Sequence, residues 1–221
     1  MTQHPAKYSD ALLPFIAHYL QGAANVLDPM GGSGKLAKIK AYGYRGRVIC
    51  NDLEPEWAAR ENVANGYAVD LWQHSDAAAM TWAADAAFDA IATSPTYGNR
   101  MADHHNARDA SRRITYRHKL GRALHPENTG AMQWGAAYRH KHLAIYRECL
   151  RVLKPGGLFV LNVSDHIRGG RRVYVSKWHL DALRGLGMRL RGCHAIKTPR
   201  NRFGANARAR CAAEYVFVLV K

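Results

Sequence analysis

Residues 26–35, VLDPMGGSGK, decide the fold. An apolar run ends at Asp28, three glycines and a serine follow, and a segment of helical character begins at Lys35. Glycines lack the side chain that keeps the backbone away from a ligand, and the first amides of the following helix point toward that ligand. The stretch therefore predicts a strand, a ligand-binding turn and a helix in succession.

Two familiar glycine motifs do not fit this stretch. A phosphate-binding P-loop, GxxxxGK[ST], needs glycine at position 29 and serine or threonine at 36, where the chain has Pro29 and Leu36. The dinucleotide pattern GxGxxG is also absent. The ligand of this turn is therefore neither a nucleotide held by a P-loop nor a dinucleotide held by that pattern.

Apolar runs of strand length alternate with helical segments along the rest of the chain. This alternation is typical of an α/β protein with a mostly parallel sheet and helices on both faces. Strands are expected at 25–28, 47–52, 67–71, 88–93, 158–163, 188–197 and 215–220, and helices at 11–20, 35–41, 56–65, 142–153 and 176–186.

The length of 221 residues fits a single domain, which we assign to residues 1–221. Residues 98–138 break the rhythm because they are polar and lack apolar periodicity. Loops of this length within a domain usually carry function, so we treat 98–140 as an insertion. A second irregular segment, the basic loop 198–212, lies between the last two expected strands.

A second candidate site residue, Asp52, ends the strand expected at 47–52. A carboxylate at this strand end can accept hydrogen bonds from both hydroxyls of a ribose. Glu54 competes for this role, and the spacing to Pro55 favours Asp52.

Residues 93–97, TSPTY, directly follow the strand expected at 88–93. Together with the glycine turn and Asp52, they resemble the class I S-adenosylmethionine-dependent methyltransferases that methylate amino groups of DNA bases. That family carries DPFxGxG in the turn and [DNS]PP[YFW] after the fourth strand. Met30 replaces the phenylalanine of the first motif, and Thr96 replaces the second proline of the other.

The resemblance implies a Rossmann-like fold: a mostly parallel seven-stranded sheet with helices on both faces and an antiparallel last strand. It also implies roles for individual residues. Ser94 and the carbonyl of Pro95 would accept hydrogen bonds from the target amine, and Tyr97 would stack on a base flipped out of the duplex. The cofactor S-adenosylmethionine would be held by Lys7, Tyr8, Asp28, Pro29, Met30, Gly31, Gly32, Gly34, Asp52, Leu53, Asp76, Ala77 and Ser94.

The charge is divided unevenly along the chain. Residues 1–97 hold 7 basic and 10 acidic side chains, whereas residues 98–221 hold 25 basic and 7 acidic ones. Segregated positive charge of this size favours a polyanionic partner, and we expect nucleic acid. The expected DNA contacts are Arg100, Arg112, Arg113, Arg117, Lys119, Arg122, Arg200, Arg202, Arg208 and Arg210.

Other partners and locations are not favoured. The four cysteines are far apart and form no CxxC pair, which indicates reduced, mostly buried thiols. The histidines lack the converging cysteine or carboxylate spacing of a metal site, so no metal is expected. The N-terminus has no apolar signal region and no segment is apolar enough to span a membrane, so we expect a cytoplasmic protein.

These observations predict a small DNA methyltransferase of the restriction–modification type, acting on cytosine N4 rather than adenine N6. We expect no separate target-recognition domain of the kind that the family carries, so recognition would come from the insertion and the basic loop. Two alternatives stay open. One is an RNA base-amine methyltransferase. The other is a catalytically silent nucleic-acid-binding protein, and it stays open because Thr96 replaces a proline of the catalytic motif.

Overall fold

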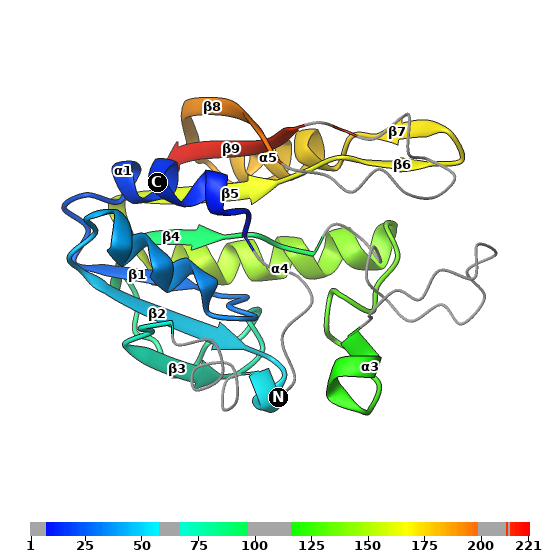
Figure 1. The fold of residues 1–221 in the computed structure, drawn as a ribbon, viewed down its shortest axis with the longest axis horizontal. Helices are drawn as coiled ribbons and strands as arrows, with labels where there is room; N and C mark the ends of the chain where they lie inside the picture. The colour runs from blue at the N-terminus through cyan, green and yellow to red at the C-terminus, as the bar shows by residue number, and fades with distance from the viewer. Residues whose placement is uncertain (1–7, 58–66, 97–115, 199–210, 212) are drawn as a thin grey trace.

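The computed structural model describes residues 8–57, 67–96, 116–198, 211 and 213–221 (Figure 1). Its elements, in chain order, are η1 (Asp10–Leu12), α1 (Leu13–Tyr19), β1 (Asn25–Asp28), η2 (Lys35–Tyr42), β2 (Arg47–Asp52), β3 (Leu71–His74), β4 (Phe88–Thr93), α3 (Tyr116–Leu120), α4 (Ala136–Val152), β5 (Leu153–Val163), β6 (His166–Arg168), β7 (Arg171–Val173), α5 (Val175–Gly185), β8 (Arg189–Lys197) and β9 (Ala213–Val220).

The main sheet has seven strands in the order β3-β2-β1-β4-β5-β9-β8. Strands β1 to β5 pair in parallel, and β9, the last strand of the chain, runs antiparallel between β5 and β8. The predicted Rossmann-like architecture is thereby confirmed. Because β2 and β3 lie on one side of β1 while β4 and β5 lie on the other, the strand order reverses between β1 and β4.

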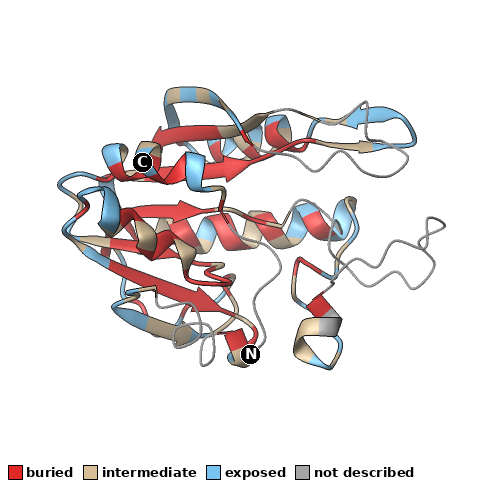
Figure 2. Ribbon diagram, in the orientation of Figure 1, coloured by how far each residue is buried: buried red, intermediate tan, exposed pale blue. Residues whose placement is uncertain are grey.

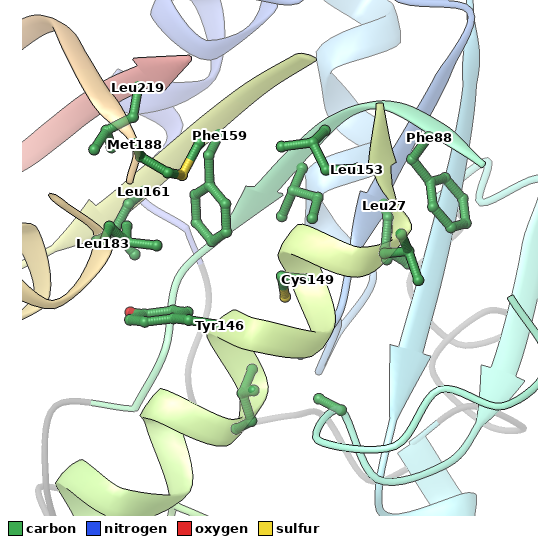
Figure 3. Packing of buried hydrophobic residues seen from close by; sticks show 14 of the residues in the cluster. Leu27, Phe88, Tyr146, Cys149, Leu153, Phe159, Leu161, Leu183, Met188 and Leu219 are labelled. Atoms are coloured by element: carbon green, nitrogen blue, oxygen red, sulfur yellow. The ribbon is translucent and has the colours of Figure 1, made fainter. Parts of the chain in front are cut away.

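Helical segments cover both faces of the sheet (Figure 1). Side chains of successive strand residues point to opposite faces, so each central strand contributes to two hydrophobic cores. On β1, Leu27 joins the core beneath α4 and α5, where Tyr146 and Leu183 also pack (Figure 3). Its neighbour Val26 joins the core on the other face, with Ile16 of α1. Alternation along short apolar runs is therefore what fixes β1 in the centre of the sheet.

Strands β1, β2 and β4 begin and end where the sequence predicts, but the edge strand β3 does not. The prediction for it was 67–71, whereas β3 spans Leu71–His74. This strand forms no fully buried face, and Leu71 is exposed, so its sequence lacks a clear apolar signal. Its position is set instead by Asp70, whose carboxylate accepts the backbone N–H of Val48 at 2.7 Å.

The region around α4 also departs from expectation. Helix α4 begins at Ala136, inside the segment that we expected to be irregular, and α3 lies in that segment as well. Strand β5 begins at Leu153, directly after α4, although Pro155-Gly156-Gly157 suggested a later start. Gly156 takes a positive φ of 75° and lies in the irregular stretch of β5 between Leu153 and Leu158, where the register of pairing with β4 shifts.

The hairpin of β6 and β7 was not predicted, because its two strands have three residues each and are polar. Residues 58–65 of the helix expected at 56–65 lie outside the described residues. Cys50 and Cys149 are buried, but the expectation of mostly buried thiols is wrong for Cys193, which is exposed on the edge strand β8.

Candidate active site

The expected site residues gather at the carboxyl edge of the parallel strands. Asp28 ends β1, Asp52 ends β2, and Ser94 follows the end of β4. Since β1 lies between β2 and β4, these three positions are neighbours at the point where the strand order reverses. Open α/β sheets bind their ligands at such switch points, in the crevice outside the strand ends.

Asp28 joins β1 to β4 across the switch point. Its carboxylate accepts the Thr93 hydroxyl at 2.9 Å, the Tyr8 hydroxyl at 3.2 Å and the backbone N–H of Met30 at 3.2 Å. The side chain is buried, and loss of water raises the pKa of Asp28 to about 7 despite these donors. Asp28 thus ionises near neutral pH, where a cationic ligand would favour its charged form.

Asp52 ties the glycine turn to the end of β2. One carboxylate oxygen accepts the backbone N–H of Gly32 at 2.8 Å, and the other accepts that of Glu54 at 2.8 Å. Burial raises the pKa of Asp52 to about 6. Gly34 has a φ of 68°, and a Cβ there would lie 2.8 Å from the Trp72 ring, so this glycine is required by backbone conformation and packing. The turn is therefore held rigidly from within the protein.

Glu54, the rival of Asp52, has a different role. It is fully buried and accepts the Arg122 guanidinium at 2.7 Å, the His125 backbone N–H at 2.8 Å and the Asn128 amide at 2.9 Å. Arg122 also bonds Glu56 through two of its nitrogens. Glu54 therefore anchors the segment after α3, and Arg122, expected at DNA, forms internal ion pairs.

Asp76 and Ala77, which we expected to hold the cofactor, follow the end of β3. The Asp76 carboxylate accepts the backbone N–H of Ala78 at 2.9 Å and the Lys141 ammonium of α4 at 2.5 Å. Ala77 is buried in the core beneath α4. The carbonyl of Leu53 lies 3.1 Å from Nε2 of His74 at the end of β3. Strands β2 and β3 and helix α4 thus jointly fix this part of the edge.

Ser94 is oriented by a residue of the neighbouring strand. The Asn162 amide on β5 donates to Oγ of Ser94 at 3.3 Å and to the Glu214 carboxylate of β9 at 2.9 Å. Asn162 is buried, as is Pro95, so the donor and the turn both occupy fixed positions. The hydroxyl of Ser94 is thereby held at the strand end rather than rotating with solvent.

Thr96, which replaces the second proline of the resembled motif, is held on both its side chain and its main chain. Its hydroxyl lies 2.9 Å from that of Thr129, and its carbonyl accepts the hydroxyl of Tyr138 from α4. The Tyr138 hydroxyl also contacts Nε2 of His179 at 3.0 Å, and Tyr146 contacts Nδ1 of the same ring at 2.6 Å. Burial lowers the pKa of His179 well below its ordinary value, so the ring is neutral.

The remaining expected site residues lie on α3 or outside the described residues. Lys119 is half-buried on α3, and Arg117 belongs to α3 with its side chain outside the described part. The remaining expected residues lie outside the described residues: Lys7, Tyr97, Arg100, Arg112, Arg113, Arg200, Arg202, Arg208 and Arg210.

No family model and no curated protein matches the chain. Solved structures do match: TrmN from Thermus thermophilus has a TM-score of 0.54 at 20% identity and covers 94% of this chain. A methyltransferase structure from Methanosarcina mazei has a TM-score of 0.58 at 14% identity, with 94% of this chain and 97% of that one covered.

A third match carries a bound cofactor product. The structure of 1,6-didemethyltoxoflavin-N1-methyltransferase from Burkholderia thailandensis, with S-adenosylhomocysteine, has a TM-score of 0.54 at 18% identity and covers 96% of this chain and 79% of that one. The chain has the fold of the class I S-adenosylmethionine-dependent methyltransferases. It spans about half of TrmN, with 48% of that structure covered. No helix in the described ranges is long and apolar enough to cross a membrane.

The sequence did not reveal the residues that hold Asp28, Ser94 and Thr96 in position. Thr93 was recognised as part of a motif but not as the partner of Asp28. Asn162 and Tyr138 carry no local motif, and only the pairing of β4 with β5 and the packing of α4 bring them to Ser94 and Thr96. A buried polar residue inside an apolar strand, as Asn162 is, was the one available signal.

Proposed function

We propose that the chain transfers a methyl group from S-adenosylmethionine to an exocyclic base amine of DNA, cytosine N4 in preference to adenine N6. The observation that carries this proposal is the placement of Ser94-Pro95 at the end of β4, beside the Asp28 cluster and with the Ser94 hydroxyl held by Asn162. This is the edge at which the fold binds a ligand.

The residues at this edge fit the proposed cofactor. Asp52 is a buried carboxylate at a strand end, where it can accept ribose hydroxyls, and it already fixes the backbone N–H of Gly32. Tyr8 and Asp28 place a hydroxyl and a carboxylate together beyond β1. Because Asp28 has a pKa of about 7, a positively charged ligand would stabilise its ionised form at neutral pH. When bound, S-adenosylmethionine supplies an electrophilic methyl group on a positively charged sulfur.

The chemistry required of the protein is to orient a poor nucleophile. The lone pair of a base amine is delocalised into the ring, so the amine must be turned before its nitrogen can attack. Ser94 Oγ and the carbonyl of Pro95 would each accept one amine N–H, which directs the lone pair toward the methyl group. The cofactor, held by Asp52 and the glycine turn, would supply its methyl group to this lone pair, and the excess proton on the methylated amine would pass to solvent.

Charge supports nucleic acid over a small molecule as the methyl acceptor. The chain has a formal net charge of +15, and the excess comes from the half that follows Tyr97. A neutral small substrate gains nothing from so much surface charge, whereas a phosphate backbone is attracted by it. An RNA substrate and a catalytically silent binding protein are separate outcomes of the test below.

The test is incubation with tritiated S-adenosylmethionine and duplex DNA, single-stranded DNA or total RNA. We expect label in DNA, and a rate that falls about a hundredfold or more in Ser94→Ala, by analogy with the loss of one positioned polar group. Ser176→Ala is a matched control, because Ser176 is a buried serine at the start of α5. Label in RNA alone would favour the RNA alternative, and no label with retained DNA binding would favour a silent protein.

A further inference from the structure

The β6–β7 hairpin concentrates positive charge at the edge that carries the candidate active site. It leaves the main sheet at the carboxyl end of β5, and β5 pairs with β4 through Thr93 and Leu161. Ser94 and the root of the hairpin therefore belong to adjacent strand ends. Figure 1 shows the hairpin extending beyond the sheet on the side where α4 begins.

The hairpin is a defined structure and is held at its root. The buried carboxylate of Asp165 accepts Nε of Arg172 at 2.8 Å and the backbone N–H of Ser176 at 2.8 Å. Arg172 also donates to the hydroxyl of Tyr215 on β9 at 2.8 Å. The charge of Arg172 is thus matched by Asp165, and its role is to fix the hairpin to the sheet and to α5.

Two other arginines are placed at the tip and differ from Arg172. Arg168 and Arg171 are exposed, and Figure 2 shows the β6–β7 hairpin tip in the colour of exposed residues. Among the described residues, neither arginine forms an ion pair. Arg168 only donates to the Gln133 side chain, at 3.3 Å. The sequence from 166 to 180 contains no acidic residue, so this charge is not compensated within the hairpin or α5 up to that point.

The tip itself offers open space. Gly169 and Gly170 have φ values of 56° and 73°, and a Cβ at either position would meet no atom within 4 Å. The turn therefore exposes main chain between the two arginines. Tyr174, which follows β7, is 61% exposed, and its ring lies 5.3 Å from the Arg172 guanidinium. The tip therefore presents the two uncompensated cations of Arg168 and Arg171 beside exposed main chain, which suits contact with phosphate groups.

We propose that the β6–β7 hairpin is an arm that contacts the phosphodiester backbone of the nucleic-acid substrate through Arg168 and Arg171. This rests on the proposed function and adds a contact surface to it. The arm lies next to the strand end that carries Ser94, so a nucleic acid held by it is presented to the candidate active site. Because Arg172 fixes the hairpin to Asp165 and Tyr215, the two tip arginines are in position before the substrate binds.

The test compares two double variants of the full chain. Arg168→Ala/Arg171→Ala removes the tip charges, while Arg189→Ala/Arg191→Ala removes two exposed arginines of β8 at the opposite edge, where Arg189 pairs with Val220. Affinity for a fluorescent duplex DNA and for an RNA of the same sequence is measured over a range of salt concentrations. We expect the tip variant to bind about tenfold more weakly, and the slope of log affinity against log salt to fall by about 1–2.

The β8 variant controls for net charge, because it loses the same two charges. Equal weakening in both variants, or an unchanged slope in the tip variant, would overturn the inference. Methyl transfer is measured on the same samples, so that failure of the inference about the arm can be told apart from failure of the proposed function. Weaker binding by the tip variant without any methyl transfer by the wild type would support the arm and contradict the function. Methyl transfer by the wild type, together with unchanged DNA binding by the tip variant, would support the proposed function and contradict the arm.

Discussion

The hydroxyl of Tyr138 donates a hydrogen bond to the carbonyl of Thr96, which joins α4 to the segment after β4. A proline at position 96 would stiffen the turn by fixing its own φ. Here Tyr138 and Thr129 hold Thr96 from outside the turn instead. The departure from the resembled motif is therefore matched by hydrogen bonds from distant parts of the chain, so loss of the proline does not imply loss of a defined turn.

We predict that Tyr138→Phe slows methyl transfer while leaving cofactor affinity within a few-fold. The variant frees the Thr96 carbonyl and leaves Nε2 of His179 without its tyrosine, so it also lowers the free energy of unfolding by about 1–3 kcal/mol. Tyr146→Phe is the matched control, because Tyr146 bonds the other nitrogen of the same ring and does not contact Thr96. Single-turnover rates that fall equally in both variants would show that stability, not the turn, limits the reaction.

Asp52→Asn should weaken binding of S-adenosylmethionine by about 1.5–3 kcal/mol, the range for hydrogen bonds to a charged group. The amide keeps the shape of the side chain but presents only one acceptor oxygen to the Gly32 and Glu54 amides and to a ribose. Asp70→Asn serves as control, since the Asp70 carboxylate accepts the backbone N–H of Val48 near the beginning of β2, away from the glycine turn. Calorimetry would count against the cofactor site if the two variants bound equally well.

The stability of Asp28→Asn relative to the wild type should rise with pH. Burial raises the pKa of Asp28 to about 7, whereas in the unfolded chain it is about 4. Between these values the folded wild type keeps a proton that the unfolded chain has lost, so ionisation destabilises the fold as pH rises, by up to about 1.4 kcal/mol per pH unit. The amide does not titrate and loses this dependence.

Urea denaturation of both proteins across this window measures the difference. Burial lowers the pKa of His142 to about 4 and holds that of His179 well below its ordinary value, and these rings act with the opposite sign. They are common to both proteins and cancel in the comparison. A difference that stays constant from pH 4 to 7 would mean that Asp28 is already ionised in the folded protein at the acidic end.

Arg122→Ala should lower the free energy of unfolding by about 1.5–3 kcal/mol, because the buried carboxylate of Glu54 loses its charged donor. The same variant should leave the salt dependence of DNA binding unchanged, since the guanidinium is already paired with Glu54 and Glu56. Arg147→Ala, an exposed position on α4, should change stability by less than about 0.5 kcal/mol. A smaller slope of log DNA affinity against log salt in Arg122→Ala would show that Arg122 contacts DNA.

The fold was predictable where apolar residues occur in short runs. Strands β1, β2 and β4 are buried on both faces, and their sequences show it without ambiguity. The edge strand β3 and the β6–β7 hairpin contact solvent, so they lack an apolar pattern. They depend on side-chain hydrogen bonds of Asp70 and Asp165, which the local sequence does not predict. The start of α4 was missed because its first turns are polar on the outer face.

The candidate site was predictable only in part, for a related reason. Asp28, Asp52 and Ser94 lie at ends of predicted strands, so topology alone brings them together. Their supports come from far along the chain: Asn162 reaches Ser94 across 68 positions, and Tyr138 reaches Thr96 across 42. Contacts over such separations follow from packing, which no motif records.

The most direct test of the account is the identity of the methylated nucleoside. DNA is incubated with the protein and labelled S-adenosylmethionine, digested to nucleosides and separated, with mass spectrometry of each labelled peak. The account predicts label in N4-methylcytosine, or in N6-methyladenine, and its loss in Ser94→Ala, because Ser94 and Pro95 are placed to accept hydrogen bonds from an amine. Label on a ring carbon or a ribose hydroxyl, or full labelling of an amine by Ser94→Ala, would contradict it.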